Sequence, residues 1–240
     1  MGVSPASIGK RKASGMLPSP RIVPVILAAG RAPALAMPQA LARFGARTAL
    51  EIAIANCRAA RDARRRRLLA PPVVVLGWRA ADVLRALLRP GSAASRDVRI
   101  VVNRRWRAGQ MNSLRAALRH ILPGTAVLLY PVDYALITPR ILTALAQALA
   151  REQRRESRAK RSGRRSACIM VPTHRGRTGH PVLFSAALRP ELLAASTARD
   201  VVERDPARII RVPVPKPAIW QDFDTPAEYR RCLRAFGSSQ

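Results

Sequence analysis

The sequence predicts an α/β fold of three layers, in which helices cover both faces of a mostly parallel, mixed sheet. Short apolar runs rich in β-branched residues alternate along the chain with segments of helical periodicity. The chain has 240 residues, of which 48% are hydrophobic, and this is enough to bury a sizeable core. No run approaches the roughly 20 apolar residues that cross a membrane as a helix. We therefore expect a single domain over residues 21–237, with no membrane partner.

Seven apolar runs bounded by turn residues are the expected strands, and helical segments lie between and after them. The strands are expected over residues 22–28, 72–76, 98–103, 126–131, 168–172, 182–185 and 209–214. The helices are expected over residues 48–67, 80–89, 110–120, 139–152, 187–195 and 226–236. Thr48, Thr138 and Thr225 stand at helix starts, where a threonine hydroxyl accepts a hydrogen bond from an N–H group of the first turn.

Two segments lack the periodicity of packed structure. Residues 1–20 mix Ser, Pro, Gly and Lys, which predicts a disordered basic tail. Residues 152–166 concentrate Arg, Lys, Ser and Gly, which predicts a flexible basic insertion within the domain. An alternative treats the start of the chain as an export signal with residues 22–30 as its apolar core. Pro24 and Arg31 interrupt that stretch, and a buried first strand explains it better.

The charge of the chain indicates an anionic partner. Lys and Arg number 43 against 14 Asp and Glu, so the formal charge is +29 and polyanions are attracted to the surface. The basic residues are spread over the whole chain and aromatic residues make up only 4% of it, too few for base-stacking platforms. Dedicated nucleic-acid binding is therefore disfavoured, whereas phosphorylated small molecules fit the same charge.

The cysteines exclude two further classes of protein. Cys57, Cys168 and Cys232 are odd in number and widely scattered, with no Cys-x-x-Cys pair. This pattern excludes a disulfide scaffold and a zinc ribbon. We expect the protein to work in the reducing cytoplasm.

The segment from Val25 to Arg31 carries the clearest indication of a ligand site. An apolar strand runs into Ala28, Ala29 and Gly30, whose small side chains let backbone N–H groups approach an anion or a base. In open α/β sheets, ligands bind outside the carboxyl ends of the strands. We therefore expect a ligand to lie against this turn.

Three aspartates are candidate metal ligands. Asp133 follows an apolar strand, where a buried carboxylate is unfavourable unless it is paired or holds a cation. Asp222 and Asp224 precede the last helix. Magnesium takes one or two carboxylates together with substrate phosphates, so Asp133 and Asp222 are the predicted Mg²⁺ ligands. The alternatives are pairing of Asp133 with an arginine, and a turn or capping role for Asp224.

The order of short motifs resembles the MobA-like nucleotidyltransferases, and in particular the molybdenum cofactor cytidylyltransferases. The resemblance begins with Leu27-Ala28-Ala29-Gly30 and continues with Pro38-Gln39-Ala40-Leu41, Phe44-Gly45-Ala46-Arg47-Thr48, Asn103, Trp106, Gly109 and Asn112-Ser113-Leu114. It ends with Leu128-Leu129-Tyr130-Pro131-Val132-Asp133, Gly179-His180-Pro181 and Asp222-Phe223-Asp224-Thr225-Pro226. The resemblance implies a Rossmann-like fold of the nucleotide-diphospho-sugar transferase type.

The resemblance also implies roles for the matching residues. Nucleotide binding falls to Leu27, Ala28, Ala29, Gly30, Arg31, Gln39 and Ser113. The acceptor side falls to Gly179, His180 and Pro181, and the metal and catalytic positions to Asp133 and Asp222. A turn role for His180 and a core position for Trp106 are the structural alternatives. The implied reaction moves a nucleoside monophosphate, with CMP favoured over GMP, from an NTP to a phosphorylated acceptor such as molybdopterin, with Mg²⁺ as cofactor.

The first motif departs from the family where the family places cations. Ala34 stands in place of an Arg and Gln39 in place of a Lys. Loss of one charge-stabilising donor commonly lowers turnover on the order of 10²–10³-fold, unless Arg31, Arg43 or Arg47 substitutes for it. A second hypothesis is therefore a catalytically impaired family member that binds a nucleotide or another ligand.

Overall fold

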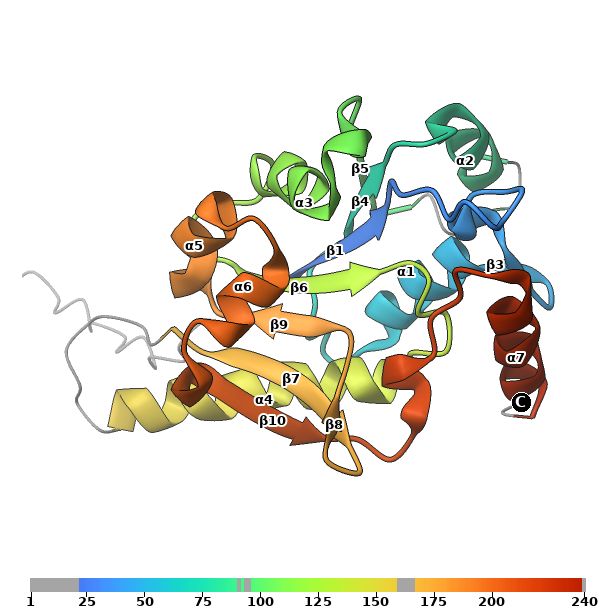
Figure 1. Ribbon diagram of the computed structural model, residues 1–240. Coiled ribbons are helices and arrows are strands. Elements are labelled where there is room, and N and C mark those ends of the chain that lie inside the picture. Colours follow the sequence, from blue (N-terminus) through green and yellow to red (C-terminus); the bar gives the residue numbers. More distant parts are fainter. Residues whose placement is uncertain (1–21, 90–91, 93–95, 159–166, 239–240) are drawn as a thin grey trace, which may run out of the picture.

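In the computed structural model, the described residues are 22–89, 92, 96–158 and 167–238, and they form a mixed sheet with helices on both faces (Figure 1). The strands run in the spatial order β10-β7-β9-β6-β1-β4-β5. Their bounds are β1 Ile22–Ala28, β4 Val73–Leu76, β5 Arg99–Val102, β6 Ala126–Pro131, β7 Ile169–His174, β9 Val182–Phe184 and β10 Ile209–Pro213. The predicted α/β class and strand positions are confirmed, with β9 the antiparallel member of this order.

The order of the strands places a switch point beside β1. From β1 the chain passes to β4 and then to β5 on one side, and it returns to pair β6 with the other side of β1. The connections that leave β1 and β6 therefore diverge at the carboxyl edge of the sheet. Ligands of open α/β sheets bind in the crevice that such a divergence leaves.

Helices pack against both faces of the sheet (Figure 1). One face carries α1 (Ala49–Ala59) and α4 (Pro139–Arg158), and the other carries α3 (Gln110–Leu118), α5 (Arg189–Ala194) and α6 (Ala198–Glu203). Alternate residues of β1 face opposite sides: Ile26 and Ala28 belong to one buried cluster, Val25 and Leu27 to the other. A parallel strand that is buried on both faces reads as a continuous apolar run, which is why the sequence revealed it.

The C-terminal helix packs against a small hairpin and α2 lies near the same end. The bounds are β2 Arg43–Phe44, β3 Arg47–Thr48, α2 Ala80–Leu87 and α7 Pro226–Gly237. The ring centroid of Phe44 lies 5.5 Å from those of Tyr229 and Phe236 on α7. The Tyr229 hydroxyl also donates to the carbonyl oxygen of Arg43, at 2.6 Å. These contacts fix the segment that enters α7, which contains Asp222 and Asp224.

Two predicted caps are reciprocal capping boxes. The Thr48 hydroxyl accepts from the Glu51 N–H while the Glu51 carboxylate accepts from the Thr48 N–H, and Thr225 and Glu228 form the same pair on α7. A third box, Thr197 with Asp200, opens α6, which the sequence analysis missed. The Thr-x-x-Asp spacing was the signal that could have found it.

Two predicted boundaries were wrong. The helix expected to reach residue 67 ends at Ala59, because Ala60 is extended and Asp62 turns the following chain by accepting from the Arg66 N–H, at 2.8 Å. The helix expected to end at residue 152 continues to Arg158, so residues 152–158 of the predicted insertion are helical. Residues 159–166 of that segment, and the predicted tail over residues 1–20, lie outside the described residues.

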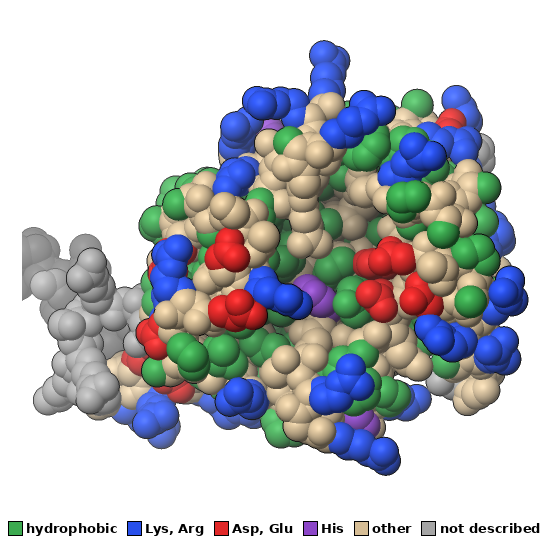
Figure 2. All heavy atoms as spheres, viewed as in Figure 1, with side chains coloured by type: hydrophobic (Ala, Val, Ile, Leu, Met, Phe, Trp, Pro, Cys, Tyr) green, Lys and Arg blue, Asp and Glu red, His purple; other side chains and the backbone are tan. Residues whose placement is uncertain are grey.

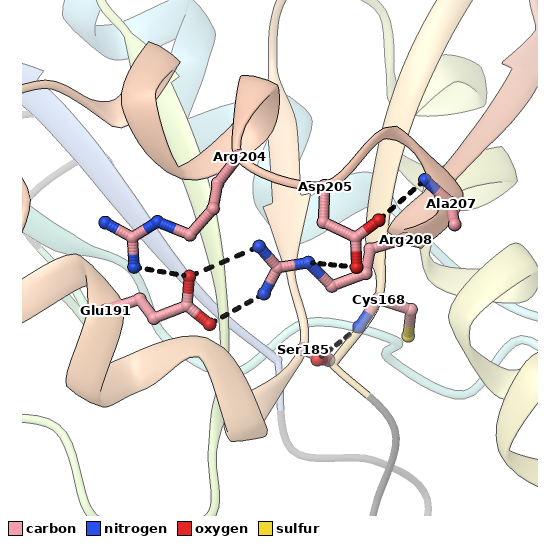
Figure 3. Close-up of polar contacts among 7 residues, drawn as sticks. All are labelled: Cys168, Ser185, Glu191, Arg204, Asp205, Ala207 and Arg208. Carbon is pink, nitrogen blue, oxygen red and sulfur yellow. Dashed lines mark hydrogen bonds and ion pairs between the residues drawn. The ribbon is translucent and has the colours of Figure 1, made fainter.

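An arginine network joins α5 to the entry of β10 (Figure 3). Arg208 Nη1 lies 2.6 Å from Glu191 Oε1, and the Arg208 side chain is only 14% exposed. Arg204, which is 52% exposed, reaches the same carboxylate at 3.2 Å. Asp205 pairs with Arg208 Nε at 3.4 Å. Arg208 is therefore the structural cation of this network.

In the described part of the chain, no helix is long and apolar enough to span a membrane. Cys57, Cys168 and Cys232 are all buried and free.

We expect Arg208→Ala to lower the free energy of unfolding by about 2 kcal/mol, because it leaves the part-buried Glu191 carboxylate without its bidentate partner. Arg204→Ala, on the exposed side of the same carboxylate, is expected to cost about 0–1 kcal/mol. Urea denaturation of both variants measures the difference. Equal losses would contradict the assignment of Arg208 as the main structural partner.

Candidate functional site

A cavity of about 270 Å³ opens at the carboxyl edge of the sheet, between the ends of β1 and β6. It is lined by Leu27, Ala28, Ala29, Gly30, Arg31, Gln39, Ala40, Trp106, Arg107, Gly109, Gln110, Ser113, Pro131, Val132 and Asp133. Figure 2 shows acidic side chains gathered beside a hollow on this face, within a largely basic surface. The structure therefore brings all the predicted nucleotide-binding residues to one cavity, together with Asp133.

Gly77 fixes the wall of the cavity behind the first turn. A Cβ at Gly77 would lie 2.6 Å from the Ala29 carbonyl oxygen and 2.6 Å from Trp106 Cβ, so these three segments meet where no side chain fits. The Trp78 N–H also donates to the Ala29 carbonyl oxygen, at 3.0 Å. The turn after β1 is thus held rigidly against β4 and the loop that contains Trp106.

Gly30 differs from Gly77 in its surroundings. A Cβ at Gly30 would meet no atom of the protein within 4 Å, and Gly30 is exposed at the cavity. The fold itself does not need a glycine at this position. A ligand that approaches the backbone is the physical reason for leaving the side chain out.

The first turn of α3 forms the opposite wall. Gly109 takes a φ of 94° at the N-cap, and the first N–H groups of a helix have no acceptor within it. Asn103, buried at the end of β5, donates from Nδ2 to Ser113 Oγ at 3.0 Å. Its Oδ1 accepts from the Arg105 N–H, also at 3.0 Å. Asn103 therefore holds the loop and the helix start in place, with Ser113 lining the cavity.

Asp133, Asp222 and Asp224 influence one another across the cavity edge. Burial, with Asp224 and Asp222 as further causes, raises the pKa of Asp133 to about 7. Burial and the charge of Asp224 also raise the pKa of Asp222, which accepts a hydrogen bond from the Tyr134 hydroxyl. The predicted pair Asp133 and Asp222 is therefore brought together, with Asp224 as a third neighbour.

Arginine does not neutralise these three carboxylates. Within the described residues, at least nine of the 14 acidic residues form ion pairs: Glu51, Asp62, Asp82, Asp97, Glu152, Glu191, Glu203, Asp205 and Glu228. Within the described ranges, Asp133, Asp222 and Asp224 pair with no Lys or Arg. The predicted alternative of an Asp133–arginine pair is therefore not found there.

The carboxylates fit a partial metal site. Neighbouring acids without a counter-charge are unfavourable unless a proton or cation joins them. No group of three or more His, Cys, Asp or Glu side chains among residues 22–89, 92, 96–158 and 167–238 is arranged to hold a metal ion on its own. Oxygen ligands from one or two carboxylates, completed by substrate and water, are the pattern that Mg²⁺ favours.

Gln39 lines the cavity, but its amide is engaged with the acidic segment. Gln39 Nε2 donates to the Phe223 carbonyl oxygen at 2.7 Å and to Asp224 Oδ1 at 2.9 Å. Both hydrogens of the Gln39 amide group are thus used in hydrogen bonds within the protein. The resemblance had implied that Gln39 binds the nucleotide. The Asp224 N–H donates to Glu228 Oε2 at 3.0 Å, so the capping acceptor is Glu228, and the Asp224 carboxylate itself does not cap the helix in this bond.

The predicted acceptor residues Gly179, His180 and Pro181 do not line the cavity. A Cβ atom at Gly179 would clash with the carbonyl oxygen of Ile219, so no side chain fits there. The His180 N–H donates a hydrogen bond to the same oxygen, at 3.0 Å. The His180 ring centroid lies 4.9 Å from that of Tyr134. Burial lowers the pKa of His180 to about 4, so its ring is neutral at pH 7.

Trp106 and Arg107 were not among the predicted nucleotide-binding residues. Trp106, for which a core position was the structural alternative, packs partly buried against one core cluster and also lines the cavity. Arg107, beside it in the 3-10 turn Trp106–Ala108, was not singled out, although its place just before the helix of Ser113 was the available signal. By contrast, Arg47 lies at a second cavity of about 820 Å³ under α7, where the lining has no acidic residue.

Gly77→Ala is expected to lower Tm by roughly 5 °C or more, because the new methyl group meets backbone and Trp106 Cβ with no room to move. Gly30→Ala is the matched control and is expected to shift Tm by about 1 °C or less. Calorimetry of both variants measures this. A large drop for Gly30→Ala would show that the fold, and not a ligand, requires that glycine.

Asp133→Asn is expected to stabilise the metal-free protein increasingly as pH rises from 5 to 8. The folded-state pKa of about 7 exceeds the unfolded value, so folding favours the protonated acid and stability is lost as pH rises through 7. In EDTA at pH 8 we expect a Tm gain of roughly 2–8 °C, falling towards pH 5. The exposed Asp97→Asn is the control. A gain that is independent of pH would contradict the burial of an ionisable Asp133.

Comparison with known proteins is consistent with this geometry. No match to a curated protein was found for the chain. The chain is similar to Rv0371c from Mycobacterium tuberculosis H37Rv (26% identity, 90% of this chain and 99% of that chain covered, TM-score 0.64). A manganese complex of the M. tuberculosis H37Rv protein is also similar (25%, 90% and 99%, 0.59). A nucleotidyl transferase from Methanothermobacter shares the fold (18%, 92% and 99%, 0.70).

The family is shown by the sequence itself. The MobA-like NTP transferase domain matches residues 24–211, which include the turn at Gly30 and all the strands of the sheet except the first two residues of β1 and the last two of β10. The predicted nucleotide-diphospho-sugar transferase-like fold is thereby confirmed. The chain belongs to the MobA-like NTP transferase domain family.

Proposed function

We propose that the protein is a nucleotidyltransferase that moves a nucleoside monophosphate from an NTP to a phosphorylated acceptor and releases pyrophosphate. The observation that carries this proposal is that Asp133, Asp222 and Asp224 have no arginine partner in the described chain and that Asp133, whose pKa both other acids raise, lines the Gly30 cavity. Membership of the MobA-like family supports nucleotidyl transfer. CMP and molybdopterin are the favoured nucleotide and acceptor, on the resemblance of the motifs alone.

Asp133 and Asp222 would hold a divalent cation, for which we propose Mg²⁺. Their uncompensated, partly buried carboxylates supply the oxygen donors that this ion prefers. The manganese complex of the similar mycobacterial protein supports a divalent ion at such a fold. When bound, the ion would neutralise negative charge on the triphosphate and on the departing pyrophosphate.

The residues around the cavity position the nucleotide. The open backbone at Gly30 lets a phosphate or base approach β1 closely, and the N-terminal turn of α3 presents N–H groups to an anion. Ser113 Oγ, fixed by Asn103, supplies a further hydroxyl. Rigid placement of this kind accelerates phosphoryl transfer because little covalent chemistry is left for the protein to perform.

The acceptor approaches from the side of His180 and Tyr134. A phosphate oxygen of the acceptor attacks the α-phosphorus in line, a new P–O bond forms, and the bond to pyrophosphate breaks. The leaving pyrophosphate carries the electron pair, so no covalent protein intermediate is needed. His180, neutral at pH 7, can offer a hydrogen bond to the acceptor without adding charge.

Ligand binding without turnover is the second candidate function. Gln39 uses its amide on Phe223 and Asp224, and Ala34 has no charge, so neither restores the cations of the family motif. A protein of this kind would bind a nucleotide and metal ion but release no pyrophosphate.

The two candidates are separated by incubating the protein with each NTP, MgCl₂ and phosphorylated acceptors and following pyrophosphate. We expect release with one NTP, and a loss of at least about 100-fold in Asp133→Asn and Asp222→Asn, because the charge that holds the cation is removed.

Asp97→Asn, an exposed aspartate paired with Arg67, is the control and is expected to keep full activity. Metal-dependent binding of an NTP without pyrophosphate release would favour the binding protein. Unchanged turnover in Asp133→Asn would overturn the assignment of the metal site.

A further inference from the structure

We propose that Arg31 and Arg107, each held against a tryptophan ring, are the two cations that bind the polyphosphate of the nucleotide. The inference rests on the proposed function and assigns the charges that the motif positions 34 and 39 no longer provide. Arg31 follows the Gly30 turn, and Arg107 lies in the 3-10 turn before α3. Both line the cavity that also contains Asp133.

Each guanidinium is stacked on its own ring. Arg31 Cζ lies 5.3 Å from the ring centroid of Trp78, and Arg107 Cζ lies 4.6 Å from that of Trp106. An arginine over an aromatic face is attracted to the ring, and its N–H groups at the edge stay free for a bidentate contact with phosphate. Stacking therefore orients the charge without consuming its donors.

The two tryptophans are anchored at the same point of the sheet. The Trp78 N–H donates to the Ala29 carbonyl oxygen at 3.0 Å, and Trp106 Cβ packs where Gly77 leaves room for it. Both rings are thus tied to the carboxyl end of β1, beside the turn that lets a ligand approach. Each arginine is held near that turn by its own ring.

Neither arginine is committed to an acidic residue of the described chain. The ion pairs found there include neither Arg31 nor Arg107. Arg79 shows the contrast, since it also lies over Trp78, at 5.9 Å, but its Nε contacts Asp82 Oδ2 at 2.5 Å. Arg79 does not line the cavity. The same ring therefore supports one structural arginine and one that is available to a ligand.

Other cations considered for the triphosphate lie elsewhere. Arg43 and Arg47 do not line this cavity, and Arg43 Nη2 donates to the Ala46 carbonyl oxygen at 3.0 Å. Gln39 is neutral and engaged with Asp224. Among the described residues that line the cavity, Arg31 and Arg107 are the only cations. Together with a divalent ion at Asp133 and Asp222, they would place positive charge on two sides of a polyphosphate.

The test measures binding by calorimetry with three probes: pyrophosphate in EDTA, CTP with MgCl₂, and CMP with MgCl₂. We expect Arg31→Gln and Arg107→Gln each to weaken pyrophosphate and CTP roughly 10–100-fold, with CMP changed less than about threefold. Arg104→Gln is the matched control, because it removes an exposed arginine from the same loop without touching the cavity. Circular dichroism checks that all variants are folded.

The supporting role of the rings has its own readout. Trp78→Phe keeps an aromatic face and is expected to retain most of the pyrophosphate affinity, whereas Trp78→Leu is expected to lose roughly 3–10-fold. The double variant Arg31→Gln/Trp78→Leu should lose no more than Arg31→Gln alone, because the ring acts only through the guanidinium.

The outcomes separate this inference from the proposed function. If the wild type binds CTP and pyrophosphate and the arginine variants bind them equally well, the assignment of Arg31 and Arg107 to the polyphosphate is overturned, but nucleotide binding by the protein is not. If the arginine variants lose pyrophosphate binding but the wild type releases no pyrophosphate from any NTP, the assignment of the two arginines is supported and the catalytic proposal fails. If the wild type binds neither probe, both are contradicted.

Discussion

The burial of neighbouring carboxylates at the edge of the sheet is the constraint on which the site depends. The chain carries 43 basic and 14 acidic residues, yet Asp133, Asp222 and Asp224 share no ion pair with a Lys or Arg of the described residues. Burial is the main cause that raises the pKa of Asp133 to about 7, and the charges of Asp224 and Asp222 add to it. No arginine of the described residues compensates the charge of these carboxylates. A bound proton or cation must therefore do so in the native state.

The positions of these acids follow from topology and from two packing contacts. The divergence of chain at β1 and β6 opens the edge of the sheet, and Gly77 lets β4 and the Trp106 loop close in behind the Gly30 turn. On the other side, Phe44 packs against α7 and fixes the segment that contains Asp222. Rigid elements thus surround a turn whose own backbone is left open, which is the arrangement that a preorganised phosphate site needs.

The departures at positions 34 and 39 change how charge reaches the cavity. A lysine at position 39 would carry its charge to the acidic segment, whereas Gln39 only bridges the first loop to Phe223 and Asp224 by hydrogen bonds. Positive charge instead stands on Arg31 and Arg107, whose tryptophan rings are tied to the end of β1. Arginine suits this use because a planar guanidinium both stacks on a ring and binds phosphate at its edge.

The sequence by itself determined the fold class and the central strands, because a doubly buried strand is a continuous apolar run, and it made Asp133 a candidate ligand, because a carboxylate after such a strand is conspicuous. The helix ends at Ala59 and Arg158 were not predicted; after the first of them, Asp62 turns the chain by accepting a hydrogen bond from the Arg66 N–H. Only the tertiary structure decided that Gln39 donates a hydrogen bond to Asp224 and that Arg107 lines the cavity. These facts depend on contacts between residues far apart in the chain, and no local pattern of side chains encodes such contacts.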